Sequence, residues 1–369
     1  MMSDRELTER LALSLTDLGY ETWNFGDSVA FEALIEASDV LADERWATFA
    51  HGWSRAWATR ALPRRRLDCT APGLAMVHLA ERAHDDRLLD ATVKLAQYLV
   101  ERPRLLGVYE TWESSPLMRP YGPAVLDGAA DALVDAAPPG VFLDCLHFDP
   151  PFFAAVARAI GSEQFAQEAV DQALGYISAL QTPDGLFQHF VLRGHSGTFG
   201  PGWGRGQGWA LLGLLDVLAE FDGIPSELRE PHTQALERIT SSAADLVAAM
   251  LALQRADGHW YAVVDNVESG EEFSTAAFMA AGFLRALTRG AVHTGTEALV
   301  ERAALSAVDA VRRGILEDGT LAEVSAAVMA CTEPSHYAHV PRGFRVPWGQ
   351  GPALLALTAQ HAWDQRSGA

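Results

Sequence analysis

The chain has 369 residues, of which 49% are hydrophobic, 21% charged and 9% aromatic. This is an ordinary globular composition with ample core material, which excludes a disordered, collagen-like or fibrous chain. Asp and Glu number 48 against 28 Lys and Arg, and the formal net charge is −20. Because so acidic a chain repels phosphate backbones, we expect no nucleic-acid partner. An anionic ligand would need a local arginine.

The sequence carries no membrane or export signal that we recognise. Residues 1–15 place acids where a signal peptide needs positive charge, and no apolar run approaches the roughly 18 residues that span a bilayer. Cys69, Cys145 and Cys331 stand far apart without a CxxC pair, which is typical of reduced thiols. We therefore expect a cytoplasmic protein without a membrane partner.

Apolar residues recur at intervals of three and four through most of the chain, which predicts helices and no sustained strands. Breaks at Gly, Pro and Asp/Asn clusters delimit twelve helices. In chain order these predicted helices span residues 4–18, 26–41, 43–60, 71–83, 85–101, 147–160, 162–181, 206–221, 229–254, 274–290, 296–314 and 350–364.

The predicted helices are of two alternating kinds. Those that begin with a short acidic turn, such as Asp43-Glu44, also have a polar face, as an outer solvated layer requires. Those that begin with Gly or Pro, such as Pro72-Gly73, are apolar nearly all round and should be buried. The alternation predicts six helical hairpins that close into an all-α (α/α)6 toroid, a single domain over 1–369. Residues 4–18 would pair with 350–364 to close the ring.

One segment departs from this pattern. Residues 103–140 are rich in Pro, aromatic residues and then Ala, and they fit neither kind of helix. We interpret them as an irregular excursion over one end of the toroid, in which the Ala-rich part allows a short helix. Excursions of this length are often functional.

Two acids stand where buried helices begin. Asp144 lies in an apolar run, where burial would raise the pKa of its carboxyl group and suit a general acid. The alternative is a helix cap, which would lower that pKa. Asp68 follows three arginines and precedes a Pro-Gly start, and it is equally consistent with a capping acid paired with an arginine. Together they could meet across the mouth as an acid/base pair, or as an acid and a binder of substrate hydroxyls.

The most specific string in the chain is Trp-Gly-Arg-Gly-Gln-Gly-Trp at 203–209. Its glycines let a ligand approach the backbone, Arg205 offers a fork for a carboxylate, and Trp203 and Trp209 could stack on sugar rings. The alternative is a loop whose tryptophans cover the core. His189 follows an Asp-Gly turn and should lie at the same end of the toroid as this string.

A basic, aromatic segment precedes the last predicted helix. It contains His336, His339, Arg342, Arg345 and Trp348, and we interpret it as a wall or lid of the pocket. Its Pro-rich loop gives little support for a metal site, which needs ligands at fixed geometry. We therefore expect no metal at this segment.

The order of these motifs resembles the unsaturated uronyl hydrolases of glycoside hydrolase families 105 and 88. The likeness covers most of the chain and is most specific in the string at 203–209. The matching motifs are Trp23 to Gly26, Asp68-x-x-x-Pro72-Gly73, Leu143-Asp144-x-Leu146, Gly185-Leu186-Phe187-x-His189, Trp203-x-Arg205-Gly206-x-Gly208-Trp209 and Gly349-x-Gly351.

The resemblance implies an (α/α)6 barrel and a cofactor-independent hydrolase acting on small oligosaccharides that end in a 4,5-unsaturated uronic acid. Asp144 matches the family's general acid/base, which protonates the ring double bond and activates water, and Asp68 matches the second acid. The matching substrate-binding positions are His189, Trp203, Arg205 and Trp209. To these we add Trp23, and His147, which stands where an aromatic residue is usual; Asp149 is an extra acid.

Two other functions remain open from the sequence. A sugar epimerase on the same fold would use a pair of histidines, such as His189 with His336 or His339. A saccharide-binding relative would keep the toroid without turnover. The parent polysaccharide and the oligomeric state also remain open.

Overall fold

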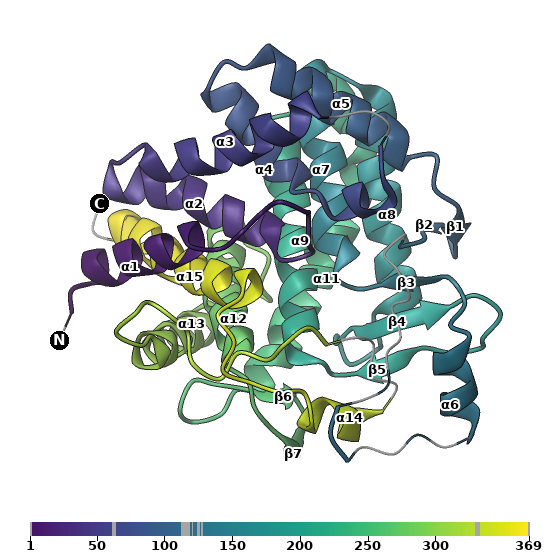
Figure 1. The fold of residues 1–369 in the computed structure, drawn as a ribbon, viewed down its shortest axis with the longest axis vertical. Helices are drawn as coiled ribbons and strands as arrows, with labels where there is room; N and C mark the ends of the chain where they lie inside the picture. The colour runs from purple at the N-terminus through teal and green to yellow at the C-terminus, as the bar shows by residue number, and fades with distance from the viewer. Residues whose placement is uncertain are drawn as a thin grey trace.

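The computed structural model describes residues 2–60, 64–111, 119, 121–123, 126, 128–328 and 333–367 (Figure 1). In this part of the chain, consecutive inner helices pack on one another and the last returns to the first, so that the ring closes. The inner helices are α2 (Asp27–Leu41), α4 (Gly73–Arg82), α7 (Cys145–Ile160), α9 (Gly204–Asp222), α12 (Phe273–Arg289) and α15 (Pro347–Ser367).

A second layer of helices surrounds this ring, and each of them packs on an inner helix. The outer helices are α1 (Asp4–Thr16), α3 (Arg45–Thr59), α5 (Asp86–Leu99), α8 (Glu163–Leu180), α11 (Thr233–Ala252) and α13 (Glu297–Gly314). Helix α1 packs against α15 and thereby closes the outer layer, as predicted. The all-α (α/α)6 toroid expected from the sequence is therefore confirmed.

Burial explains why the two kinds of helix occupy different layers. In α12 twelve of seventeen residues are buried, from Ser274 to Ala286, whereas α5 buries only an apolar stripe of six among fourteen. A helix without a polar face must lie inside, and a helix with one can face water. The inner layer is also packed tightly: a Cβ atom on Gly213 of α9 would lie 2.4 Å from the Leu146 carbonyl oxygen of α7.

The sequence missed the short elements that connect the helices. The prediction of no sustained strands holds, but the structure contains strand segments of two to six residues, which are too short to show alternation in the sequence. The described strands are β1 (Arg104–Leu105), β2 (Val108–Tyr109), β3 (Gly140–Phe142), β4 (Gln188–Leu192), β5 (Phe199–Pro201), β6 (Tyr261–Val263) and β7 (Asn266–Glu271). The short helices are η1 (Arg66–Thr70), α6 (Gly128–Asp135), α10 (Ser226–Arg229), η2 (Glu230–His232) and α14 (Pro334–Ala338).

The excursion predicted at 103–140 contains the hairpin of β1 and β2, helix α6 and the first residue of β3. Parts of this segment, including 112–118, lie outside the described residues. The short helix allowed by its Ala-rich sequence is α6. Strand β3 then pairs with β4, which pairs with β5, and this sheet lies beside the helical ring (Figure 1).

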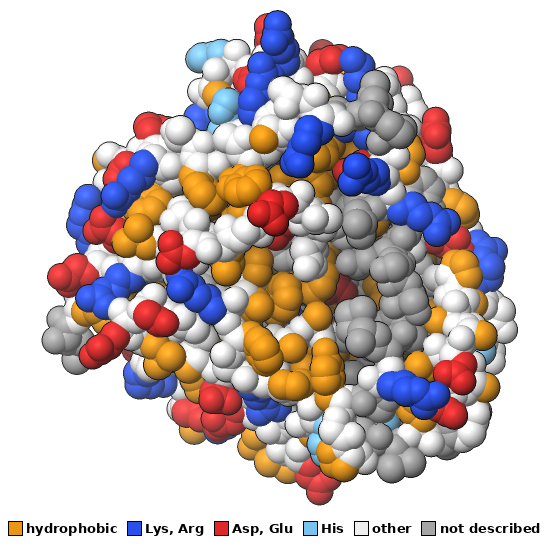
Figure 2. Space-filling view, in the orientation of Figure 1, with side chains coloured by type: hydrophobic (Ala, Val, Ile, Leu, Met, Phe, Trp, Pro, Cys, Tyr) orange, Lys and Arg blue, Asp and Glu red, His pale blue; other side chains and the backbone are white. Residues whose placement is uncertain are grey.

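Two further expectations concern the whole chain. Cys69 and Cys145 are buried, and neither forms a disulfide with another described residue, which agrees with the prediction of reduced thiols; Cys331 lies outside the described residues. No described helix combines the length and the apolar character that crossing a bilayer requires. On the face shown in Figure 2, hydrophobic side chains gather near the middle and charged side chains surround them.

Candidate functional site

The site is built where the inner helices begin, at the end of the helical ring that we call the rim. Asp144 immediately precedes α7, Trp203 precedes α9 and Glu272 precedes α12. Strand pairing brings the first of these next to His189: β3 pairs with β4, and the Leu143 amide donates a 2.8 Å hydrogen bond to the His189 carbonyl. Sheet β3-β4-β5 therefore fixes two predicted site residues at the same rim.

The Asp144 carboxylate does not cap its helix. Its backbone is already helical, with φ −53° and ψ −35°, and among the described residues no amide donates a capping hydrogen bond to it. The side chain is 15% exposed, and its Oδ2 atom lies 3.7 Å from Nε2 of His189. Of the two interpretations open from the sequence, the capping one is not what the structure shows.

His189 is held on two sides. Its Nδ1 atom lies 2.8 Å from the hydroxyl of Tyr337 on α14, and its ring centroid lies 4.2 Å from that of Trp203. The imidazole is only 2% exposed, so its orientation is set by these neighbours. Tyr337 was not predicted, because a tyrosine in the segment before the last helix carries no sequence signal for a contact with β4.

Arg205 is fully buried and already paired. Its guanidinium lies 3.1 Å from the Glu272 carboxylate and donates a 2.8 Å hydrogen bond to the Ser325 hydroxyl, and it lies over the Trp203 ring. Burial lowers the pKa of Arg205, while the Glu272 charge opposes that shift. Because Glu272 neutralises it, Arg205 is placed to hold the loops together rather than to receive a charge on a ligand.

Asp68 has the capping role that the sequence left open. One carboxylate oxygen accepts a 2.7 Å hydrogen bond from the Arg65 amide and the other a 3.0 Å hydrogen bond from the Trp57 indole. Trp57 in turn packs on Trp23, with ring centroids 6.3 Å apart. Asp68 and Trp23 therefore lie on one stretch of the rim, and Asp68 is partly exposed.

Contacts continue from this stretch to the loops around Asp144. Phe25, two residues after Trp23, stacks on Trp348 with ring centroids 4.7 Å apart. The Trp348 indole donates a 3.0 Å hydrogen bond to the Ser325 carbonyl, and the Ser325 hydroxyl contacts Arg205. A chain of contacts thus joins the segment that carries Asp68 to the loops around Asp144, both at the N-terminal ends of inner helices.

Two predicted binding residues do not lie on this rim. Trp209 is fully buried in the second turn of α9, where its ring packs on His147 and Phe278. His147 is 1% exposed and faces Glu32 and Asp216 inside the ring. Their burial argues against direct contact with a substrate at the mouth.

The segment before α15 is anchored by its basic residues. Arg342 donates a 2.6 Å hydrogen bond to the Ser269 carbonyl of β7, and Arg345 forms a 2.8 Å ion pair with Asp17 at the end of α1. These contacts tie the segment down, and the Arg345 charge is paired with Asp17. The side chain that this segment presents to His189 is Tyr337.

One buried acid near the rim was not identified from the sequence. Asp27 opens α2 directly after the Trp23 motif, is 3% exposed and accepts a 2.8 Å hydrogen bond from the Asn24 amide. Burial raises the pKa of Asp27 to about 7. An acid in the first turn of a helix is common, so its sequence position alone does not distinguish it.

Comparisons with known proteins identify a family and relatives of this chain. Residues 6–362 match the family described as glycosyl hydrolase family 88. The chain is 24% identical over 338 residues to the unsaturated rhamnogalacturonyl hydrolase YesR of Bacillus subtilis (strain 168), covering 91% of this chain and 88% of that protein.

Two solved structures share the fold over almost the whole chain. A possible member of the GH105 family from Salmonella enterica superposes with a TM-score of 0.80 at 17% identity, covering 99% of this chain and 96% of that one. The unsaturated glucuronyl hydrolase from Bacillus sp. GL1 superposes with a TM-score of 0.68 at 16% identity, covering 96% of each chain.

Proposed function

The chain belongs to glycosyl hydrolase family 88, and we propose that it is a glycoside hydrolase that removes a 4,5-unsaturated uronic acid from the non-reducing end of lyase-generated oligosaccharides. Family membership confirms the resemblance seen in the sequence. The similarity to a hydrolase named for unsaturated rhamnogalacturonyl groups supports this substrate class. The likeness to an unsaturated glucuronyl hydrolase is consistent with it.

The observation that carries the proposal is the state of the Asp144 carboxylate. It is partly exposed, uncapped by its own helix and 3.7 Å from the buried imidazole of His189. An acid/base group must reach the reacting atoms, and the Asp144 side chain, which makes no capping hydrogen bond to a described amide, is free to do so. Asp68 by contrast holds Trp57 and the Arg65 amide.

In the proposed reaction, Asp144 donates a proton to one carbon of the ring double bond. Positive charge develops on the neighbouring carbon, which also bears the ring oxygen. The resulting Asp144 carboxylate accepts a proton from a water molecule as the oxygen of that water bonds to this carbon. The hydrated sugar opens spontaneously and releases the remaining saccharide and an open-chain keto-uronic acid.

The other rim residues have supporting roles in this proposal. The Trp203 ring packs against His189 and offers an aromatic surface beside the reacting group, and Trp23 lies on the same stretch of the rim as Asp68. Asp68 is partly exposed and would accept hydrogen bonds from ring hydroxyls in addition to its structural contacts. Arg205 acts by positioning Trp203 and the loop at Ser325.

The structure gives no specific support to the alternatives. An epimerase would need a second histidine beside His189, but the side chain that contacts Nδ1 is the Tyr337 hydroxyl. A saccharide-binding relative would not need an accessible carboxylate at Asp144. Both remain distinguishable by experiment, because neither consumes the double bond.

The test follows the ultraviolet absorbance of the conjugated enol-carboxylate in a panel of lyase-generated disaccharides. We expect the wild-type chain to abolish this absorbance for at least one disaccharide, and Asp144→Asn to lose about 100- to 10,000-fold in rate, as general acid–base catalysis contributes. Asp90→Asn is the matched control, since Asp90 is exposed beside Lys94 on α5. Equal rates in Asp144→Asn and Asp90→Asn would overturn the assignment.

A further inference from the structure

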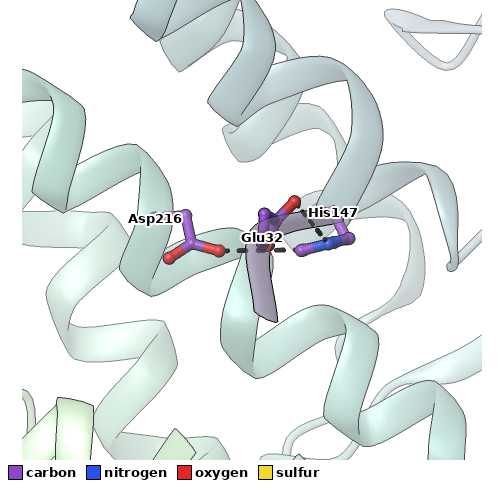
Figure 3. Close-up of side chains that lie close together, drawn as sticks. All are labelled: Glu32, His147 and Asp216. Atoms are coloured by element: carbon purple, nitrogen blue, oxygen red, sulfur yellow. Dashed lines mark ion pairs between the residues drawn. The ribbon is translucent and has the colours of Figure 1, made fainter. Parts of the chain in front are cut away.

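A second cluster of chemically active side chains lies inside the ring, away from the rim. Glu32 of α2, His147 of α7 and Asp216 of α9 approach one another from three inner helices (Figure 3). Each offers one nitrogen or oxygen atom such that all three atoms lie within 4.8 Å of one another. The proposed reaction uses none of these residues.

The polar atoms of this cluster are buried but unsatisfied. Both ring nitrogens of His147, Oε1 of Glu32 and Oδ2 of Asp216 have no hydrogen-bond partner within the described part of the chain. The Nε2 atom of His147 lies 3.3 Å from Glu32 and Nδ1 lies 3.8 Å from Asp216. Buried polar groups are nearly always satisfied, so these unsatisfied atoms on three neighbouring side chains indicate a missing partner, which could take only one of the two ring nitrogens.

The local charge indicates that this partner is a cation. Arg285 of α12 lies 3.1 Å from the other oxygen of Asp216 and 2.6 Å from Glu36. With a neutral imidazole, the three carboxylates of Glu32, Glu36 and Asp216 face this one guanidinium. The Glu36 side chain is 36% exposed, so solvent screens it, and the largely buried carboxylates of Glu32 and Asp216 leave one negative charge uncompensated, which favours a bound cation.

A route to the cluster exists from the opposite end of the ring. A cavity of about 460 Å³ borders Glu32 and Asp216 and is lined by residues of α2, α4, α9, α12 and α15. The side chain of Asp216 is 14% exposed and that of Glu32 8%. An ion could therefore enter without passing the rim that carries Asp144.

We propose that Glu32, His147 and Asp216 bind a divalent transition-metal ion of the Zn²⁺ class. Imidazole and carboxylate ligands together favour such an ion over Mg²⁺ or Ca²⁺. Zinc–ligand distances of about 2.0–2.2 Å place neighbouring ligand atoms of a tetrahedron about 3.3–3.6 Å apart. The 3.3 Å between Nε2 of His147 and Oε1 of Glu32 already matches this spacing. The Asp216 ligand atom lies within 4.8 Å of the other two and would have to move closer on binding.

The experiment uses the full chain without a histidine tag, freed of metal by dialysis against a chelator. Isothermal titration with Zn²⁺ should give one saturable site, and Co²⁺ should produce the visible absorption of a low-symmetry site. Asp216→Asn and His147→Gln should each weaken binding by more than the roughly 10- to 100-fold that loss of an outer-shell partner costs. Circular dichroism establishes that each variant is folded.

The matched control is His78→Gln, because His78 borders the same cavity but already contacts Glu220 at 2.7 Å. It should bind Zn²⁺ as the wild type does. The proposal is overturned if the wild type shows no saturable Zn²⁺ site, which would make His147 a charged imidazole between two carboxylates. It is equally overturned if Asp216→Asn, with its side-chain volume kept, binds as tightly as the wild type.

Discussion

His189 lies between Asp144 and Tyr337, with Nε2 3.7 Å from the Asp144 carboxylate and Nδ1 2.8 Å from the Tyr337 hydroxyl. The hydrogen bond at one ring nitrogen sets the protonation of the other. When the Tyr337 hydroxyl donates to Nδ1, the imidazole proton resides on Nε2 and points toward Asp144. In that tautomer, Tyr337 of α14 sets the direction of the imidazole proton beside Asp144 at the start of α7.

Removing the Tyr337 hydroxyl should therefore affect turnover more than binding. In Tyr337→Phe we expect kcat to fall about 10-fold or more with KM little changed, because His189 loses its fixed orientation beside Asp144. Steady-state kinetics on the best disaccharide measures both constants. Tyr20→Phe is the control, since the Tyr20 hydroxyl bonds the Leu15 carbonyl at the end of α1. An unchanged kcat in Tyr337→Phe would contradict this role.

Asp27 should make stability depend on pH. Its pKa is about 7 in the folded chain, against an ordinary value of 3.8, so the folded state binds more protons between these values. Stability contributed by the protonated form is therefore present below pH 4 and lost as pH rises through 7. At about 1.4 kcal/mol for each pH unit, the loss is at most about 4 kcal/mol.

Asp27→Asn removes this dependence, because an amide does not ionise and its oxygen can still accept from the Asn24 amide. Urea unfolding between pH 4.5 and pH 8 should show that the free energy of unfolding of the variant rises relative to that of the wild type as pH rises. Parallel stability curves for the two proteins would mean that Asp27 does not titrate in this range.

The buried pair of Arg102 and Asp149 should be needed for stability. Their side chains are 0% and 1% exposed, and the charged atoms lie 2.8 Å apart. Asp149→Asn leaves the Arg102 charge buried without compensation, which costs about 3–5 kcal/mol. Urea denaturation measures this cost. Asp90→Asn, which breaks an exposed pair, should cost no more than about 1 kcal/mol, and similar costs for both variants would refute the difference.

Gly213 should be irreplaceable within α9. A Cβ atom there would meet the Leu146 carbonyl oxygen at 2.4 Å, and a backbone atom cannot rotate away. We expect Gly213→Ala to destabilise the fold by about 1–3 kcal/mol despite the better helix propensity of Ala. In Gly52→Ala, on exposed α3, no described atom lies within 4 Å of the new Cβ. That variant should gain up to about 1 kcal/mol, and thermal unfolding of both compares them.

The architecture could be predicted because the distribution of apolar residues around each helix matches the layer in which that helix lies. A helix such as α12, apolar on all sides, has no stable place except the inner ring, and its alternation with amphipathic helices such as α5 specifies hairpins. The short strands could not be predicted in this way. Strand β3 has three residues, and its pairing with β4 depends on a contact across almost fifty residues of chain.

The rim was predictable in part for the same reason. Asp144 and Trp203 stand at starts of inner helices, and such starts must share one end of a ring. The partners of Arg205 were not predictable, since Glu272 and Ser325 reach it from distant loops. His147 shows the converse, because one helical turn beyond Asp144 its side chain faces the ring interior.

The most direct measurement is to run the reaction in deuterated water and follow the product by NMR. Hydration initiated by Asp144 predicts one deuterium on the ring carbon that was protonated, a keto-uronic acid without the double bond, and loss of the ultraviolet absorbance. These changes should disappear in Asp144→Asn. Release of an intact unsaturated uronic acid, with the absorbance retained and no deuterium on carbon, would instead show cleavage at the anomeric carbon and contradict the account.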